Sequence, residues 1–181
     1  ERFQCIFAKN EGAVTAPATG LHFSREMMKR MEIYDIASAF IALHCGLSNF
    51  RNTDVEDLTK HKMDSEEMFI TRENCDIVNN AKDAGHKIVA VGTTVQRAIE
   101  TAADTLGHIN PFEGWTNKFI FPPYKFQVAD AMFSNFQLPE STLLMLTAAF
   151  GNFDYTMNAY KVALKEDYKF GPFGDVMLIV D

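Results

Sequence analysis

The sequence predicts an α/β fold, with a mixed or largely parallel sheet flanked by helices and with residues 1–181 forming a single domain. Short apolar segments typical of buried strands alternate along the chain with longer segments of helical periodicity. Glycine and proline residues mark most of the boundaries between these segments. The chain has 181 residues, 47% of them apolar, which is enough to bury a core. Such alternation is typical of α/β proteins.

Local signals predict each element. In chain order, the expected strands are 3–8, 36–44, 69–70, 87–91, 118–121, 126–133 and 176–180, and the expected helices are 24–31, 71–85, 95–106, 140–150 and 154–167. Ser24 and Thr71 are the expected N-caps of two helices, because a hydroxyl can accept a hydrogen bond from the first turn. Gly85 and Gly107 are expected to end helices, since glycine tolerates the left-handed conformation. Residues 92–94, Gly-Thr-Thr, are expected to form a turn.

The charge of the chain argues against a free-standing nucleic-acid binder. It carries 24 acidic and 17 basic residues, a net charge of −7, whereas such binders usually have a basic excess. Binding to nucleic acid therefore requires a positive surface from elsewhere, or a local cluster such as Arg25, Lys29 and Arg30 on one expected helix.

The cysteines and the hydropathy indicate a reducing compartment. Cys5, Cys45 and Cys75 are too few and too scattered for a disulfide framework or a zinc knuckle, and each is expected to be a small buried apolar residue. No signal peptide is evident, and no apolar run approaches the roughly 18 residues that span a membrane. We expect a cytoplasmic protein without membrane contact.

Residues 134–150 are the most informative segment. Pro139 suits a first helical position, and Glu140 would place a negative charge at the positive end of the helix dipole. Four polar side chains crowd this helix start, where backbone N–H groups are also unpaired: Asn135, Gln137, Ser141 and Thr142. This combination suits a polar or anionic ligand, although capping and turn formation would explain it as well.

The same segment closely resembles a block of a known enzyme family. Residues 134–146 read Ser-Asn-Phe-Gln-Leu-Pro-Glu-Ser-Thr-Leu-Leu-Met-Leu. The S-adenosylmethionine:tRNA ribosyltransferase-isomerases, the enzymes of queuosine biosynthesis, carry Thr-Asn-Phe-His-Leu-Pro-x-Ser-Thr-Leu-Leu-Met-Leu.

Five further blocks follow in the family's order. Residues 15–23, Thr-Ala-Pro-Ala-Thr-Gly-Leu-His-Phe, are similar to Thr-Ala-Pro-Thr-Ala-Gly-Leu-His-Phe. Residues 173–179, Phe-Gly-Asp-Val-Met-Leu-Ile, resemble the closing Tyr-Gly-Asp-Ala-Met-Leu-Ile. Residues 43–50 resemble Leu-His-Val-Gly-Leu-Gly-Thr-Phe, residues 61–66 resemble His-x-Met-His-x-Glu, and residues 91–100 resemble Val-Gly-Thr-Thr-Ser-x-Arg-x-Leu-Glu. Six ordered blocks identify the chain as a member of this family.

The resemblance implies an architecture and a reaction. Family members carry a further stretch that includes an all-β domain, so we expect this chain to be the C-terminal α/β portion of a longer protein; the lack of an initiating Met favours a fragment. The family transfers the ribosyl part of S-adenosylmethionine to 7-aminomethyl-7-deazaguanine at the tRNA wobble position. The product is epoxyqueuosine, and adenine and methionine are released. The implied partners are S-adenosylmethionine, as a substrate, and the tRNA anticodon region through the full-length protein.

The reaction requires a base beside the sulfonium and groups that recognise the substrate, and the cofactor itself carries the leaving groups. The candidate catalytic residues are His44, His61, Glu66 and Asp175. The candidate substrate-binding residues are Thr15, Pro17, His22, Gly46, Thr93, Thr94, Arg97, Asn135, Ser141 and Thr142. No metal is expected, because no histidine has a second ligand at zinc spacing. We expect a monomer.

Structural roles are the alternative for several of these residues. Each histidine could be a satisfied structural residue, and Glu66 could be one solvated charge among Asp64 and Glu67. Arg97 could form an exposed ion pair with Glu100 or Asp104. Asp175 stands before an apolar strand, where a carboxylate needs a partner or a function. Trp115, Phe121 and Tyr124 could stack on a base of the tRNA; the alternative interpretation is ordinary packing around Pro122-Pro123.

The chain also departs from the family pattern. Asp64 and Gln137 replace two histidines, Ser48-Asn49-Phe50 replaces Gly-Thr-Phe, and Val95 replaces a serine. Glutamine cannot titrate, and aspartate ionises in a different range from histidine. Two hypotheses follow: the parent protein is a working ribosyltransferase-isomerase, or it is a non-catalytic or repurposed paralogue that binds S-adenosylmethionine or a nucleotide. A third is that the fragment is a scaffold whose site another domain completes.

Overall fold

The computed structural model describes residues 4–47, 53 and 55–180. The helices are η1 (Ala18–His22), α1 (Arg25–Ile33), η3 (Leu58–Lys60), α2 (Arg72–Asp83), α3 (Thr93–Ala102), α4 (Thr142–Phe150) and α5 (Phe153–Lys165), of which η1 and η3 are 3-10 helices. The strands are β1 (Ala42–Leu43), β2 (Glu66–Ile70), β3 (Val89–Val91), β4 (Phe112–Thr116), β5 (Ala131–Asn135) and β6 (Val176–Val180).

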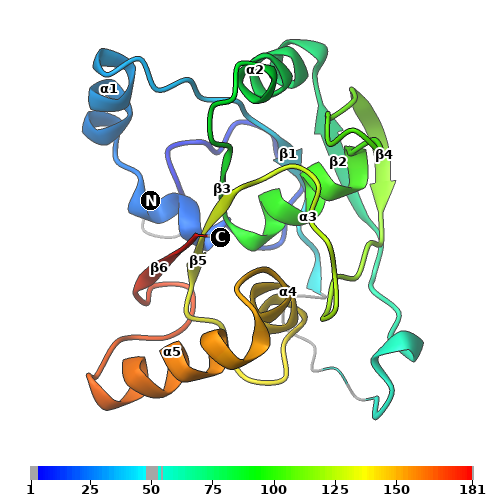
Figure 1. The fold of residues 1–181 in the computed structure, drawn as a ribbon, viewed down its shortest axis with the longest axis vertical. Helices are drawn as coiled ribbons and strands as arrows, with labels where there is room; N and C mark the ends of the chain where they lie inside the picture. Colours follow the sequence, from blue (N-terminus) through cyan, green and yellow to red (C-terminus); the bar gives the residue numbers. More distant parts are fainter. Residues whose placement is uncertain (1–3, 48–52, 54, 181) are drawn as a thin grey trace.

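The described strands form two three-stranded sheets. One has the order β1-β2-β4 and is antiparallel throughout. The other has the order β3-β5-β6, in which β3 and β5 are parallel whereas β5 and β6 are antiparallel. The predicted α/β class is therefore confirmed, and the mixed sheet is divided into two small ones. Figure 1 shows helix α3 between the two sheets.

Helix α3 joins the two sheets through a common core. It contacts β3 and β5 on one side and β1 and β4 on the other. The largest apolar cluster takes residues from both sheets and from α3: Met68, Ile70, Cys75, Ala90, Ala98, Ile99, Ala102, Ile109, Ile120, Val128, Met132 and Leu146. Burial of this apolar surface stabilises the fold and fixes the position of α3, whose first turn reaches the candidate site.

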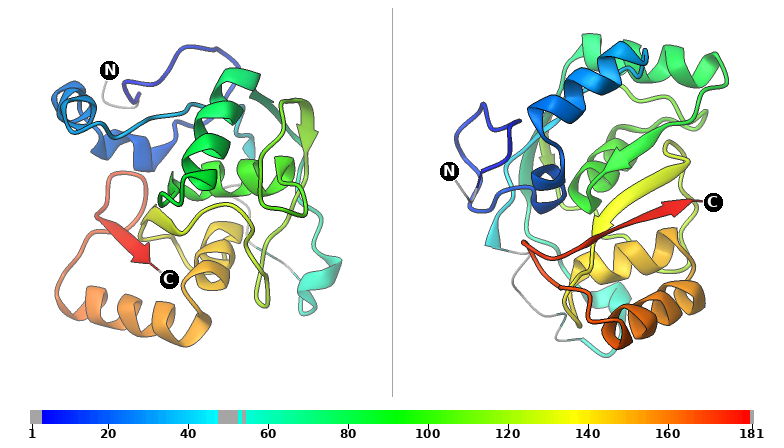
Figure 2. Two further views of the ribbon diagram at one scale, coloured as in Figure 1. Left: turned by 45° about the horizontal axis from the view of Figure 1, so that its top comes forward. Right: turned by 90° about the vertical axis from the view of Figure 1, so that its left-hand side faces the viewer.

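Helices α4 and α5 pack against each other at one end of the molecule, as both views of Figure 2 show. A second cluster lies between α5 and the segment after β5, where Phe136, Tyr160 and Ala163 are buried. The rings of Phe136 and Tyr160 meet edge to face, with centroids 5.3 Å apart. The hydroxyl of Tyr160 accepts a hydrogen bond from the backbone N–H of Gln137 at 2.8 Å, so α5 holds the segment that leads into α4.

Several local predictions are confirmed. The hydroxyl of Ser24 accepts a hydrogen bond from the backbone of Met27, and that of Thr71 accepts one from Asn74, so both residues cap their helices as expected. Gly85 has a φ of +78° directly after α2. The last expected strand coincides with β6. The three cysteines are buried.

Two expected strands in the first half are wrong or too long. Residues 4–8 form no strand, and Phe3 lies outside the described residues. Of residues 36–44, only β1 pairs with a neighbour. The backbone N–H of Phe40 bonds to the side chain of Asn74 at 2.8 Å instead of to a strand, and the Phe40 side chain is 49% exposed. The run is therefore a strand only at Ala42–Leu43, beside β2, whereas Phe40 bonds to a side chain of α2.

Strand predictions between 110 and 133 also needed correction. Residues 118–121 form no strand, and β4 at Phe112–Thr116 was missed because Gly114 resembles a turn signal. Residues 126–130 are irregular and β5 begins only at Ala131, since the carboxylate of Glu100 accepts the N–H groups of Gln127 and Val128. These groups therefore do not take part in a ladder.

Two helices begin elsewhere than predicted. Helix α3 includes Thr93 in its first turn, so residues 93–94 are helical and do not form a separate turn. Helix α4 begins at Thr142, because Glu140 has a left-handed φ of +59° and the Ser141 hydroxyl caps the backbone N–H of Leu144. Pro139 and Glu140 thus precede the helix. Within the part of the chain described here, no helix combines the length and the hydropathy that a membrane span needs.

Candidate functional site

The candidate site lies where the parallel strands β3 and β5 end. Because the two strands run in the same direction, their carboxyl ends meet at one edge of the sheet, the usual place for a ligand in such sheets. Strand β3 leads through Gly92 into α3, and β5 ends at Asn135. Gly92 has a φ of +104°, and a Cβ there would lie 3.4 Å from the Thr94 hydroxyl. Glycine therefore permits the sharp entry into α3.

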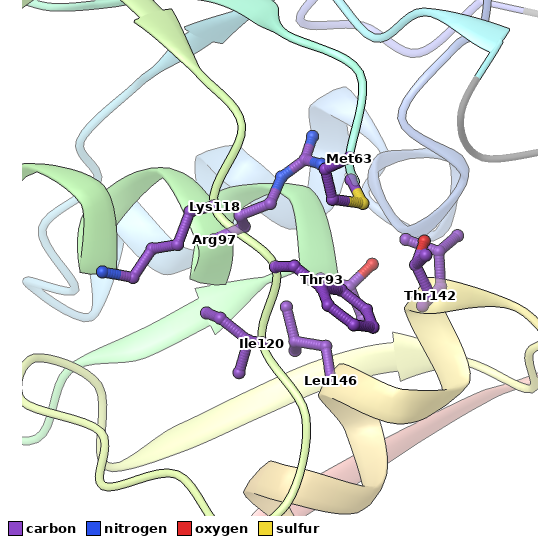
Figure 3. A pocket seen from close by; sticks show the side chains of 9 residues that line it. Met63, Thr93, Arg97, Lys118, Ile120, Thr142 and Leu146 are labelled. Atoms are coloured by element: carbon purple, nitrogen blue, oxygen red, sulfur yellow. The ribbon is translucent and has the colours of Figure 1, made fainter. Parts of the chain in front are cut away.

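A small pocket opens between the first turns of α3 and α4 (Figure 3). Its volume is about 10 Å³, enough for about one water molecule. Its lining residues are Met63, Thr93, Arg97, Lys118, Phe119, Ile120, Thr142, Leu143 and Leu146. Thr93, Arg97 and Thr142 were predicted from the sequence as binding residues, and the structure brings them together here. Apolar side chains form most of the remaining wall.

Arg97 and Glu66 form a buried ion pair beside this pocket. The side chain of Arg97 is 4% exposed, that of Glu66 is 1% exposed, and Nη2 of Arg97 donates to Oε2 of Glu66. Oε1 of Glu66 accepts the backbone N–H of Gly46 at 2.8 Å, which joins a third predicted residue to the pair. Glu66 is therefore not a solvated charge, and Arg97 does not form an exposed ion pair with Glu100 or Asp104. The carboxylate of Glu100 bonds instead to Tyr124 and to the backbone of Gln127 and Val128.

Burial has two further consequences for Arg97. Desolvation lowers the pKa of its guanidinium, although the group remains the local cation because arginine starts from so high a value. Nε and Nη1 are also buried, and neither has a hydrogen-bond partner among the described residues. A buried donor without a partner is costly, so such a group is suited to a ligand.

Asn135 organises a second polar group at the end of β5. Its Oδ1 accepts a hydrogen bond from the Thr19 hydroxyl at 3.0 Å, and its Nδ2 lies 3.2 Å from Nε2 of His22. Nδ2 also donates to the carbonyl oxygens of Gly171 and Gly174, both at 3.3 Å. Asn135 is 1% exposed, and its amide joins η1 to the segment that precedes β6.

The two polar residues at the start of α4 differ in their roles. Ser141 is a helix cap, since its hydroxyl donates to the carbonyl of Leu138 and accepts the N–H of Leu144. The hydroxyl of Thr142 is buried and has no partner in the described part of the chain, and Thr142 lines the pocket. Thr142 is thus available to a ligand, whereas Ser141 is already satisfied.

Other predicted residues lie apart from the pocket. The ring of His44 contacts Phe69, with centroids 6.0 Å apart, and the ring of His61 contacts Phe119, a pocket-lining residue, at 4.7 Å. Asp175 is exposed and accepts the backbone N–H of Lys169 at 2.7 Å, which gives it a role in the turn before β6. Pro17 starts η1, the helix that carries His22, and Thr15 is half-buried just before it.

The residues that depart from the family pattern also have structural surroundings. The side-chain amide of Gln137 donates to the hydroxyl of Ser134 at 3.3 Å. Val95 packs against the main core, and Asp64 is half-buried beside Met63. Residues 48–50 lie outside the described residues. Trp115 is 64% exposed on β4, whereas Tyr124 bonds to Glu100 and stacks edge to face on Phe126.

Sequence reasoning missed several contributors to the site, of which Thr19 and Met63 are examples. Thr19 was part of a block but was not a candidate; its contact with Asn135 spans 116 positions and leaves no local signal. Met63 lines the pocket from the segment before β2, and its apolar character suggested only core packing. In the described residues no cluster of three or more His, Cys, Asp or Glu side chains is arranged to hold a metal ion.

The fold and the site define a class of protein. A mixed α/β protein that gathers hydroxyls, an amide and a buried arginine at the ends of parallel strands is suited to bind a polar small molecule. The chain belongs to the family described as "Queuosine biosynthesis protein", whose profile matches residues 1–179.

Individual relatives agree with this assignment. The chain is 68% identical over 181 residues to the S-adenosylmethionine:tRNA ribosyltransferase-isomerase of Phocaeicola vulgatus, covering all of this chain and 52% of the relative. It is 55% identical over 180 residues to the protein of that name from Flavobacterium psychrophilum, with 99% and 52% covered. A crystal structure of S-adenosylmethionine tRNA ribosyltransferase from Thermotoga maritima matches 90% of this chain and 51% of that chain, with a TM-score of 0.74 and 36% identity. The chain spans about half the length of the curated relatives it matches.

Proposed function

We propose that this chain is part of an S-adenosylmethionine:tRNA ribosyltransferase-isomerase and corresponds to the half of the relatives that it matches. This enzyme would transfer the ribosyl part of S-adenosylmethionine to 7-aminomethyl-7-deazaguanine at the tRNA wobble position, giving epoxyqueuosine and releasing adenine and methionine. The observation that supports this most is the 68% identity, over every residue of the chain, to a relative of that name. The alternative of a non-catalytic paralogue rested on Asp64 and Gln137, and neither residue lines the pocket.

The proposed roles of the site residues follow from their surroundings. Thr93, Arg97 and Thr142 would bind the substrate at the pocket, with Thr94 next to Thr93 in the first turn of α3, while Glu66 would hold Arg97 in place. Asn135 would position His22 and η1 at the end of β5. The chemistry needs a base beside the sulfonium, and His61 is the candidate whose ring contacts a wall residue of the pocket. His44 and Asp175 would then have structural roles.

The proposed partners are S-adenosylmethionine and tRNA, the latter at its anticodon region. With a net charge of −7, this chain alone is not suited to a polyanion, so most of the positive surface would come from the rest of the protein. Helix α1 could add to it, because Arg25, Lys29 and Arg30 are exposed there. We further propose a monomer in the cytoplasm, the compartment that three buried cysteines suit; the chain would act as one domain, and no metal would be needed.

The test is adenine release by the full-length protein. We expect adenine to form from S-adenosylmethionine only when tRNA carrying the aminomethyl-deazaguanine precursor is present. Unmodified tRNA is the control, since it offers no acceptor amine. Absence of adenine under conditions in which a related enzyme turns over would reject the proposed function.

A further inference from the structure

We propose that the pocket between α3 and α4 is a carboxylate subsite, which takes the α-carboxylate of the methionine half of S-adenosylmethionine. This inference rests on the proposed function and makes it specific: it assigns Thr142 and Arg97 to one functional group of the substrate. Figure 3 shows the hydroxyls of Thr93 and Thr142 and the guanidinium of Arg97 around the pocket.

The first argument is hydrogen bonding. Thr142 is 5% exposed and Arg97 is 4% exposed, yet the Thr142 hydroxyl and two guanidinium nitrogens, Nε and Nη1, have no partner among the described residues. Both residues line the same pocket. Buried polar groups are nearly always paired in native proteins, so two unpaired groups at one pocket indicate an acceptor that binds there. A carboxylate is such an acceptor, because it offers oxygen lone pairs and no hydrogen atom.

The second argument is charge. Glu66 neutralises Arg97, so the ion pair alone leaves no net charge for an anion. However, α3 and α4, of 10 and 9 residues, both direct their N-terminal ends at the pocket through Thr93 and Thr142. Each such end carries a partial positive charge of about half a unit. Gly92 at the start of α3 has no side chain to cap the helix, which leaves first-turn N–H groups for a ligand.

The third argument concerns which anion fits. Ile120, Leu143 and Leu146 form apolar walls, and the volume of the pocket is only about 10 Å³. The ammonium of Lys118 is directed elsewhere, 5.8 Å from the centre of the Tyr124 ring. A phosphate of the tRNA backbone, by contrast, is usually met by an exposed basic surface. A carboxylate, which is smaller than a phosphate, matches this small pocket better.

The experiment compares two ligands and two variants of the full-length protein by calorimetry. The ligands are S-adenosylmethionine and its decarboxylated analogue, which lacks only the carboxylate. Thr142→Val removes the hydroxyl at constant shape. Thr156→Val is the matched control, because the Thr156 hydroxyl is also buried without a partner in the described residues but lies outside the pocket, on α5.

We expect the unmodified protein to bind the decarboxylated analogue about tenfold or more weakly than S-adenosylmethionine, as for loss of hydrogen bonds to a charged group. Thr142→Val should weaken binding of S-adenosylmethionine about tenfold, leave the analogue unaffected and keep the melting temperature, whereas Thr156→Val should bind both ligands normally. Equal binding of the two ligands by the unmodified protein, or equal losses of affinity for S-adenosylmethionine in the two variants, would overturn the assignment of a carboxylate subsite.

Adenine release separates this inference from the proposed function. If the unmodified protein turns over but Thr142→Val binds S-adenosylmethionine normally, the subsite is wrong and the function stands. If no adenine is released but the binding pattern is as expected, the subsite is supported and the proposed function fails.

Discussion

Removing the charge of Arg97 tests the buried ion pair directly. Arg97→Met keeps a long apolar side chain but leaves the carboxylate of Glu66, 1% exposed, without its cation. Breaking a buried pair by removing one partner typically costs 3–5 kcal/mol, about ten times the value of an exposed pair. We expect Arg97→Met to lower the free energy of unfolding by about 3–4 kcal/mol, because the buried carboxylate of Glu66 loses the cation that compensates its charge.

A double-mutant cycle isolates the interaction. Glu66→Gln keeps the shape of the side chain and the acceptor for Gly46 but removes the charge. The double variant buries neither charge, so we expect it to be more stable than the sum of the two single losses by about 2 kcal/mol or more. Urea unfolding followed by circular dichroism measures all four proteins. A loss below about 1 kcal/mol for Arg97→Met, or strict additivity in the cycle, would refute the reasoning.

The pH dependence of the same variant adds a second readout. A buried carboxylate that has lost its cation is relieved by taking up a proton. The destabilisation of Arg97→Met should therefore be smaller at pH 5 than at pH 8. The unmodified protein serves as the control, since its ion pair keeps the carboxylate compensated at both values.

Three further predictions concern separate parts of the molecule. Tyr160→Phe removes the acceptor of the Gln137 N–H and should lower the free energy of unfolding in urea by about 1–2 kcal/mol. Burial raises the pKa of Tyr160 to about 12, so this loss should be the same from pH 6 to 9. A pH-dependent loss would contradict this role. Burial tends to raise the pKa of Asp130, but hydrogen bonds from Ile88 and Lys87 outweigh it and hold that pKa below its ordinary value. Asp130→Asn should therefore destabilise at pH 7, by under about 1 kcal/mol because the group is partly exposed. The difference should vanish as the pH falls through the lowered pKa of Asp130, and a difference that persists in stronger acid would exclude the mechanism. Gln137→His combined with Asp64→His should leave adenine release within about twofold, since the Gln137 amide is engaged by Ser134, whereas a tenfold gain, about 1.4 kcal/mol, would favour the paralogue hypothesis.

Local sequence signals were sufficient for several elements. Ser24, Thr71 and Gly85 act within one helical turn, so their effects depend on neighbours in the sequence, and the predicted helix ends are confirmed there. The apolar run 176–180 likewise predicted β6. The order of six short blocks identified the family, which the profile match over residues 1–179 confirms.

Local signals failed where a distant group determined the backbone. Glu100 accepts the N–H groups of residues 127 and 128, and so delays β5 until Ala131. The side chain of Asn74 accepts the N–H of Phe40. The apolar run 36–44 had predicted that this N–H would bond to a neighbouring strand. In each case a side chain from another element satisfies a backbone group, and hydrophobic periodicity carries no information about that partner.

By itself, then, the sequence determined the α/β class, the N-caps at Ser24 and Thr71, the last strand and the family, because these depend on periodicity, on neighbours within a turn or on motif order. Only the tertiary structure decided the state of the site. Glu66 and Arg97 are 31 positions apart, and the sequence offered a site role or a surface charge for each; the structure shows them paired with each other and buried. Thr142 was a candidate binding residue with capping as the alternative, and the structure leaves its hydroxyl without a partner among the described residues, at the pocket. Burial and pairing depend on which surfaces the fold brings together across long sequence separations.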